Sequence, residues 1–349
     1  MRLPAAANPE RERKVFRDNT VGGSSQGSSG EAGPQPHLRP GSYGCRVIEV
    51  SPVADEAEEQ LSLDAYLETW PHEQFGLPEV QAFKAGLLDH ADLLARQGGA
   101  VLGSGFAALF PGLPESPRIM VTVPPRHRGR GAGTALYSAI SDWARERGLE
   151  TLEAVLTDND PASLAFAERR GFVQERHEKG VALDLKAIEP PPVEPPAGVE
   201  IVTWADRPEL AHGLFEISVE TSPDVPGYED EKHEPFEAWL AHEMQGPGDR
   251  PEATFVAVAG DEAVGYAKFS LSSTDSMRAY HDLTAVKRDW RRRGIARALK
   301  SAQIGWAKAN GYELLRTTND ERNTQMRRLN EQLGYRPAIG RLFLRGPLA

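Results

Sequence analysis

The sequence predicts an α/β fold in which mixed sheets, flanked by helices, occur in two similar units. Segments with the period of strands alternate with segments that have the period of helices. A predicted antiparallel hairpin, residues 253–259 and 263–269 around Gly260-Asp261, makes the sheet mixed. A pattern in the first half of the chain recurs 163 positions later. This period is too long for a solenoid and indicates a duplicated domain.

The repeated pattern is a glycine-rich turn between a strand and a helix. Arg128-Gly129-Arg130-Gly131-Ala132-Gly133 lies between the apolar segment 119–123 and a helical pattern that begins at Thr134. Arg291-Arg292-Arg293-Gly294-Ile295-Ala296 lies between segment 283–286 and a second helical pattern. Three glycine pairs share the offset: Gly131 and Gly294, Gly148 and Gly311, Gly171 and Gly334. Main-chain N–H groups converge in such a turn, so each copy predicts an anion site, usually for phosphate.

The chain divides into four predicted regions. Residues 1–42 are rich in Gly, Ser, Pro, Arg and Glu, so we predict a disordered tail. Residues 189–196 contain five prolines, which exclude helix and central strand and indicate a semi-rigid linker. The two folded units are therefore predicted at 43–188 and 197–349.

Each unit is predicted to repeat one order of elements. In the first unit we expect strands at 45–50, 100–110, 119–123 and 152–156, and from 173 onward, with helices at 58–69, 80–97, 134–147 and 161–170. The candidate N-caps of the last helix are Asp158, Asn159 and Asp160. In the second unit we expect strands at 199–203, 253–259, 263–269, 282–286, 312–318 and 341–344, with helices at 208–220, 298–309 and 322–333.

Composition narrows the function classes. The chain has 349 residues and a net charge of −11, which argues against general nucleic-acid binding. Basic residues nevertheless cluster at both turns, as a small polyanionic ligand requires. Cys45 is the only cysteine, so neither an intramolecular disulfide nor a cysteine-based zinc cluster can form, and we predict no metal site. No secretory signal and no apolar segment of about 20 residues is present, so we expect a cytoplasmic protein that does not bind membranes.

Both units resemble the GNAT superfamily of N-acetyltransferases, and together they resemble a tandem GNAT protein. Arg128-x-x-Gly131-x-Gly133 and Arg291-x-x-Gly294-x-Ala296 match the acyl-CoA pyrophosphate motif of that family. Arg169-Arg170-Gly171-Phe172 and Gln332-Leu333-Gly334-Tyr335 match its closing helix-to-strand motif. The resemblance covers roughly residues 43–188 and 197–346. It implies two acyl-CoA N-acyltransferase domains in tandem, with acetyl-CoA as cosubstrate.

The resemblance also implies where the cosubstrate binds. The strand before each turn is expected to bend at a bulge, to diverge from the next strand and to pair its freed backbone with the pantetheine arm. A freed N–H, of Val123 or Val286, would stabilise the developing oxyanion. The implied cofactor-binding residues of the first unit are Val121, Val123, Arg128, Gly129, Arg130, Gly131, Ala132, Gly133 and Thr134. Those of the second unit are Thr284, Val286, Arg291, Arg292, Arg293, Gly294, Ile295, Ala296 and Asn323.

The acid and base positions depart from the family pattern. Many members have a Tyr four residues before the closing Gly, where this chain has Ala167 in the first unit and Asn330 in the second. Asn330 could donate a hydrogen bond to the leaving thiolate or relay a proton through water. His281 and Asp282 are candidate bases in the second unit, where the first has Arg118 and Ile119. We therefore expect the second unit to be the active one.

Two functions remain open. The favoured function is transfer of an acetyl group from acetyl-CoA to an amine of a small molecule, by a monomer or homodimer. The alternative is an acyl-CoA-binding sensor or structural module in which one or both domains are inactive. Nucleotide binding is disfavoured, because neither turn has the spacing of a P-loop or of a dinucleotide fingerprint.

Overall fold

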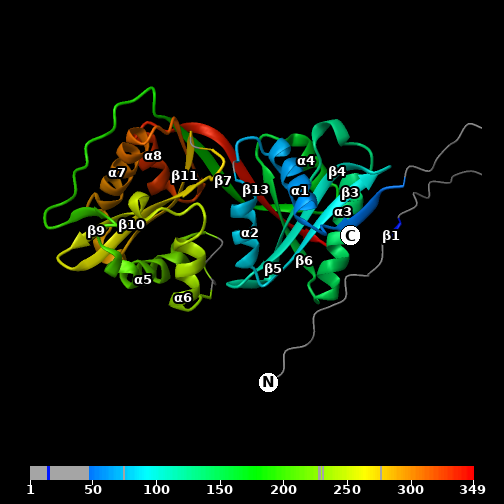
Figure 1. The fold of residues 1–349 in the computed structure, drawn as a ribbon, viewed down its shortest axis with the longest axis horizontal. Coiled ribbons are helices and arrows are strands. Elements are labelled where there is room, and N and C mark those ends of the chain that lie inside the picture. Colours follow the sequence, from blue (N-terminus) through cyan, green and yellow to red (C-terminus); the bar gives the residue numbers. More distant parts are fainter. Residues whose placement is uncertain (1–13, 16–46, 74, 227–228, 230–231, 276) are drawn as a thin grey trace, which may run out of the picture.

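The computed structural model describes residues 14–15, 47–73, 75–226, 229, 232–275 and 277–349 (Figure 1). The predicted disordered tail, residues 1–42, lies outside the described residues, apart from the two-residue strand β1 (Lys14–Val15), which pairs with β2. The described part contains no helix that is both long and apolar enough to cross a membrane.

The first unit contains the predicted elements together with one strand, β3, that the sequence did not predict. Its bounds are β2 (Glu49–Pro52), α1 (Glu56–Thr69), α2 (Leu77–Ala85), β3 (Asp89–Gln97), β4 (Ala100–Phe110), β5 (Leu113–Thr122), α3 (Ala132–Glu146), β6 (Thr151–Thr157), α4 (Pro161–Glu168) and β7 (Val173–Asp184). Asp55 caps α1 by accepting from the Glu58 N–H, and Asp160 caps α4, one of the N-caps considered from sequence.

The second predicted helix of this unit is correct only in its first part. The sequence predicted helix over 80–97, whereas α2 ends at Ala85 and residues 89–97 form strand β3. Gly86 terminates α2, and β3 then pairs on both sides, with β2 and with β4. Pairing with β4, which follows directly, and with β2, which lies far earlier in the chain, outweighs the local helix propensity of alanine and leucine in this segment.

The second unit repeats the order of the first. Its bounds are β8 (Glu200–Thr203), α5 (Ala211–Thr221), α6 (Phe236–Trp239), β9 (Phe255–Ala259), β10 (Glu262–Leu271), β11 (Arg278–Val286), α7 (Ile295–Ala309), β12 (Leu314–Asp320), α8 (Thr324–Gln332) and β13 (Arg336–Pro347). The sequence did not predict α6 or the π-helical turn Leu240–Met244 that follows it. Residues 189–196 are neither helix nor strand, and the domain boundary there stays a prediction.

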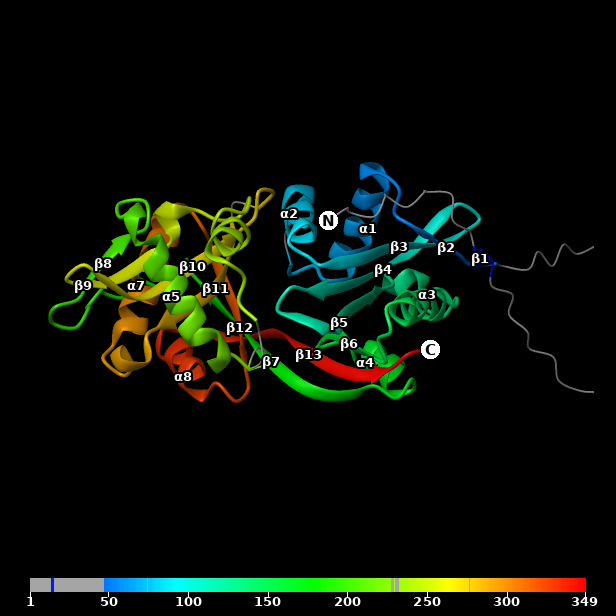
Figure 2. The same cartoon turned by 90° about the horizontal axis from the view of Figure 1, so that it is seen from below.

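The two units share one sheet, because each gives its last strand to the other. The order of strands is β1-β2-β3-β4-β5-β6-β13-β7-β12-β11-β10-β9-β8. Strand β13, at the C-terminus of the chain, pairs with β6 of the first unit, and β7 of the first unit pairs with β12 of the second. Figure 2 shows the red C-terminal strand running alongside the first unit, so that the C-terminus lies near α3.

Strands β7 and β13 pair with each other at the centre of this sheet, and their backbones approach closely there. The Asp158 N–H donates to the Gly340 carbonyl (3.2 Å), and the Glu321 N–H donates to the His177 carbonyl (2.9 Å), as an approximate two-fold relation requires. A Cβ atom on Gly180 would lie 2.0 Å from the Ile339 oxygen, and one on Gly340 would lie 2.2 Å from the Glu178 oxygen. Glycine is therefore required at both positions.

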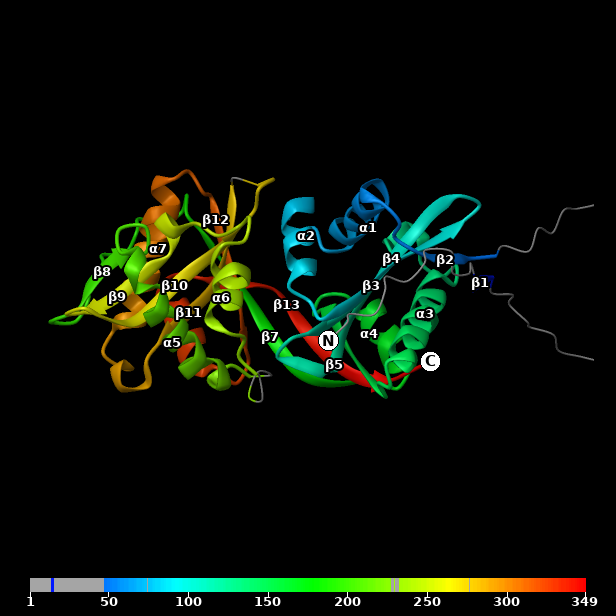
Figure 3. The ribbon, with the colours of Figure 1, turned by 60° about the horizontal axis from the view of Figure 1, so that its bottom comes forward.

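Helices cover both faces of the sheet, and β13 contributes to both layers of the first unit. Leu342 and Leu344 belong to the core beneath α3, whereas Phe343 packs with Trp70 and Val155 on the α1 side. Helix α2 lies next to the second unit (Figure 3), where the Glu79 carboxylate accepts from the Ser273 N–H (2.7 Å) and hydroxyl (2.9 Å).

Candidate active site

The strand before each glycine-rich turn diverges from its parallel neighbour, as the resemblance implied. Strand β11 pairs with β12 only from Arg278 to Tyr280, although it continues to Val286. Strand β5 pairs with β6 only at Arg118 and Ile119, although it continues to Thr122. Each unit therefore has a cleft between two diverging strands, with unpaired main-chain groups on its walls.

In both units the strand before the turn departs from regular pairing with its antiparallel neighbour, but at different places. The pairing of β10 with β11 changes from Lys268 opposite Leu283 to Phe269 opposite His281, which leaves Asp282 as the extra residue. The pairing of β4 with β5 is regular from Ser104 opposite Thr122 to Ala108 opposite Arg118, and its register shifts beyond that point, before Phe110 opposite Leu113. The irregularity in the first unit therefore lies farther from the turn than the bulge in the second.

The open edge of β11 exposes the main chain that a pantetheine arm would need. The Lys287 N–H donates to the carbonyl of Val264 on the neighbouring strand β10 (3.0 Å). Main-chain groups alternate in direction along a strand, so the N–H groups of Val286 and Thr284 point away from β10, toward the cleft. Val123 and Val121 hold the matching positions in the first unit.

Both turns have the same backbone geometry. Gly131 (φ 94°) and Gly294 (φ 93°) adopt the left-handed conformation immediately before α3 and α7. Two residues earlier Gly129 (φ 73°) and Arg292 (φ 61°) are also left-handed, and Arg292 is the only described non-glycine residue with a positive φ. This alternation points N–H groups toward one place at a helix N-terminus, as in an anion-binding nest.

The first arginine of each turn is tied to the end of its strand. Arg128 Nε donates to the Val123 carbonyl, and Arg291 Nε donates to the Val286 carbonyl, both at 3.0 Å. The outer nitrogens differ, because Arg128 pairs with Asp160 whereas Arg291 pairs with Asp224, which follows α5. Hydrogen bonds from Arg288 and Arg291 lower the pKa of Asp224.

The other predicted turn residues divide between surface and core. Arg130, Arg292 and Arg293 are exposed at the turns. Ile295 and Ala132 are 1% exposed, so they can offer a ligand only their main-chain N–H groups. Thr134 accepts a hydrogen bond from Arg170 (2.7 Å), and a Cβ atom on Gly133 would lie 3.2 Å from the Phe166 ring.

Asp282 lies beside a buried lysine that the sequence analysis did not single out. Lys268 Nζ lies 3.0 Å from Asp282 Oδ2 and 3.2 Å from Asp249 Oδ1, and it donates to the Glu243 carbonyl. Burial opposes the charge of this lysine, but the surrounding carboxylates raise its pKa. Burial raises the pKa of Asp249. The only signal for this cluster in the sequence was a lysine inside the apolar segment 263–269.

His281 does not lie where a base could meet a substrate. Its side chain is 2% exposed, with Nδ1 2.9 Å from Gln303 Oε1 and Nε2 2.5 Å from the Tyr335 hydroxyl. Burial and the nearby Lys300 lower the pKa of His281 well below its ordinary value. Of the two candidate bases, His281 is therefore buried on one face of the sheet, whereas Asp282, the next residue, is exposed on the other.

The two predicted asparagines lie on α8 and at its N-terminus. Asn323 Oδ1 accepts from the Met326 N–H (3.2 Å) and caps the helix. Asn330 is fully buried, and its amide donates to Asn319 Oδ1 on β12 (2.6 Å). Within the described part of the chain, Asn330 Oδ1 has no hydrogen-bond partner. A buried acceptor of this kind is usually satisfied by water or by a ligand. Ala167, its counterpart in the first unit, is buried and carries no such group.

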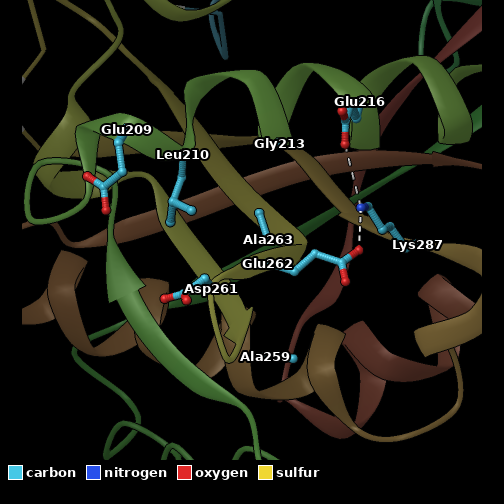
Figure 4. Close-up of a pocket in the computed structure, with 9 residues that line it drawn as sticks. All are labelled: Glu209, Leu210, Gly213, Glu216, Ala259, Asp261, Glu262, Ala263 and Lys287. Carbon is cyan, nitrogen blue, oxygen red and sulfur yellow. Dashed lines mark hydrogen bonds and ion pairs between the residues drawn. The ribbon is translucent and has the colours of Figure 1, made fainter.

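A surface depression of about 470 Å³ lies outside both clefts. It is bounded by α5 and the β9–β10 hairpin, and its polar lining consists of Glu209, Glu216, Asp261, Glu262 and Lys287 (Figure 4). Lys287 bonds to Glu262 (2.7 Å), so the depression is acidic and poorly suited to a phosphate. In the described residues no group of three or more His, Cys, Asp or Glu side chains could hold a metal ion.

A family model agrees with this geometry over most of the chain. The model of the Acetyltransferase (GNAT) family matches residues 56–172 and again residues 211–335, so that each match contains one cleft and one turn. The chain belongs to the GNAT family. Its two matched regions confirm the tandem arrangement that the repeat predicted.

Solved GNAT structures have the same fold. A tandem GNAT protein from the clavulanic acid biosynthesis pathway is 24% identical, with a TM-score of 0.67 over 86% of this chain and 98% of that one. A GCN5-related N-acetyltransferase from Sphaerobacter thermophilus is 22% identical, with a TM-score of 0.67 over 86% of this chain and 95% of that one.

Two curated GNAT relatives are more informative about chemistry. A mycothiol acetyltransferase of Nocardiopsis dassonvillei is 26% identical over 274 residues, which cover 69% of this chain and 77% of the relative. An L-2,4-diaminobutyric acid acetyltransferase of Nocardia farcinica is 41% identical over 66 residues, which cover 17% of this chain and 34% of the relative. Both are named as acetyltransferases.

Proposed function

We propose that this protein transfers an acetyl group from acetyl-CoA to an amine of a small molecule, and that the second unit carries out the reaction. The observation that carries the proposal is the open edge of β11. Two N–H groups, of Thr284 and Val286, face the cleft directly before a turn whose backbone forms an anion nest. The single cysteine suits a reducing compartment, so we propose a cytoplasmic location.

The groups at this cleft match the diphosphate and the acyl thioester of acetyl-CoA. The turn residues Arg291–Gly294 and the N–H groups of Ile295 and Ala296 would hold the diphosphate, with Asn323 at the opposite wall. No side chain obstructs Gly294, because a Cβ atom built there meets nothing within 4 Å. When bound, acetyl-CoA supplies an activated acyl thioester. The Val286 N–H is placed to donate to the acyl oxygen, which makes the carbonyl more electrophilic.

Asp282 is the residue that we propose as proton acceptor. The bulge turns its carboxylate toward the face of the sheet that α5 and α6 cover. There the ion pair with the Lys268 ammonium group fixes the orientation of the carboxylate. Three carboxylates, of Asp282, Asp249 and Glu243, surround that one ammonium group. The excess of negative charge favours an acceptor that arrives as a cation. Asn330, with its unpartnered buried oxygen, is proposed to bind near the sulfur through water.

The named relatives support a small acceptor. Mycothiol and L-2,4-diaminobutyric acid are both small molecules, and the second carries amino groups. No recognition module for a protein acceptor was found in the sequence. The two units belong to one polypeptide and exchange their closing strands, so we propose that a monomer suffices for activity.

The alternative, an acyl-CoA-binding module without turnover, makes a different prediction. Release of CoA from acetyl-CoA would be followed with a panel of small amines, for the wild type, Gly294→Val and Asp282→Asn. We expect turnover by the wild type, loss of acetyl-CoA binding in Gly294→Val, and retained binding with slow turnover in Asp282→Asn. Tight binding of acetyl-CoA without turnover on any amine would favour the alternative, and absence of binding would refute both.

A further inference from the structure

The two clefts differ in the side chains that reach across them, although their turns have the same backbone geometry. In the first unit Asp160 caps α4 on the β6 side, and Arg128 follows β5 on the other side. Their side chains meet in a two-pronged ion pair, with Nη1 to Oδ1 at 3.1 Å and Nη2 to Oδ2 at 2.6 Å. This ion pair spans the mouth of the cleft between the turn and α4.

Asp160 is held firmly in this position. It accepts from the Ser163 hydroxyl (2.8 Å) and from the N–H groups of Ala162 and Ser163 (both 3.1 Å). Although partial burial opposes it, the hydrogen bonds from Arg128 and Ser163 lower the pKa of Asp160 to about 2. A fixed carboxylate therefore holds Arg128 from the β6 side of the cleft, whereas the carboxylate that pairs with Arg291, that of Asp224, comes from the end of α5.

The interior of the first cleft is also filled. Its cavity measures about 20 Å³, room for about one water molecule, and its walls include Met120 and Val121 of β5, Val155 of β6, and Asp160. Trp70, at the end of α1, is 5% exposed and packs against Val155 and Phe343 in the apolar cluster at this place. Because Asp160 is itself one of these walls, the ion pair that fixes it also keeps this space too small for a pantetheine arm or an acyl group.

The second cleft lacks the bridging pair. At the position that matches Asp160 the chain has Asn323, whose side chain accepts only from the Met326 N–H and carries no charge. Arg291 bonds instead to Asp224 (2.7 Å), which reaches it from the end of α5, a helix that packs on β10 and β11. That contact does not cross from β11 to β12. Between these two strands, just beyond their paired residues, the uncharged Thr317 hydroxyl donates to the His281 carbonyl (3.1 Å).

We propose that only the second cleft admits acyl-CoA, and that the Arg128–Asp160 ion pair keeps the first cleft closed. Asp160 is the residue that decides between the two clefts. The first unit then serves the second by providing β7 and the contact from α2. This inference rests on the proposed function, since it takes acyl-CoA as the ligand of the open cleft.

The test counts bound CoA by native mass spectrometry and isothermal titration, with CoA itself as the probe. The wild type should bind one CoA per chain. Gly294→Val, which places a branched side chain at a left-handed position in the second turn, should bind none. Adding Asp160→Asn to Gly294→Val should restore one CoA per chain, bound in the first cleft.

A matched control removes a different ion pair of the same unit. Asp89 pairs with Arg147 (2.6 Å) at the surface, away from the cleft, so Asp89→Asn in the Gly294→Val background should leave the count at none. Circular dichroism establishes that each variant is folded. Two CoA molecules bound to the wild type would overturn the inference while leaving the proposed function intact. Restored binding in the Asp89→Asn control, or none with Asp160→Asn, would overturn the role of Asp160. No CoA bound to the wild type would instead refute the proposed function.

Discussion

The exchange of closing strands predicts that a substitution near the C-terminus destabilises the N-terminal unit. Leu344 on β13 is fully buried, and it belongs to the core beneath α3, together with Leu136 and Ile140. Shortening it to alanine removes apolar contacts and leaves a cavity in that core. Replacements of this kind cost about 2–5 kcal/mol of unfolding free energy.

A matched substitution tests the other half of the exchange. Leu183 on β7 is 1% exposed and belongs to the core of the second unit, together with Ile304 and Leu315. Leu183→Ala should therefore weaken the second unit by a similar amount, although it precedes the proline-rich linker. The two variants change one leucine each, in neighbouring strands, and are expected to act on opposite units.

Hydrogen exchange by mass spectrometry distinguishes the two outcomes. Leu344→Ala should increase the exchange of α3 amides about 30-fold or more, with a smaller effect on α7, because 2 kcal/mol changes an opening equilibrium by that factor. Leu183→Ala should affect α7 more than α3. If Leu344→Ala increased exchange in α7 first and spared α3, the strand exchange seen in the structure would be refuted.

Three further outcomes follow from the structure. Gly340→Ala places a Cβ atom 2.2 Å from the Glu178 oxygen, so it should lower the free energy of unfolding, measured by urea denaturation, by about 1–3 kcal/mol. The control Gly305→Ala, whose Cβ atom meets nothing within 4 Å, should not lower it. Asp282→Asn should lower kcat for the amine about 100-fold or more, with little change in KM for acetyl-CoA. The control Asp261→Asn, at an exposed residue, should change neither parameter. Equal effects of the two substitutions on kcat would exclude Asp282 as the proton acceptor. The lowered pKa of Asp160 contributes stability that is present above pH 3.8 and is lost as the pH falls toward 2, so Asp160→Asn should lower the urea midpoint at pH 6 but not at pH 2; an equal loss at both values would contradict this origin.

The sequence by itself determined the duplicated α/β fold, the family and the two turns. These features depend on local chemistry: a glycine with positive φ before a helix, an apolar strand ahead of it, and the same spacing repeated after 163 positions. Asp282 was a candidate base from its place at the strand before the turn, and its role stays a prediction. The helix predicted over 80–97 failed, because pairing of β3 with the distant strand β2 and the adjacent strand β4 decided the conformation of residues 89–97.

Only the tertiary structure decided which residues face one another. Local pattern cannot reveal that β13 completes the sheet of the first unit, because the pairing of β13 with β6 joins residues almost 200 positions apart in the chain. It cannot show that a bulge turns His281 into the core and Asp282 out of it, since a single extra residue reverses the faces of a strand. The same reason hid Asp160: from sequence it was one of three candidate helix caps, and only the divergence of β5 from β6 places it opposite Arg128, across the cleft that it closes.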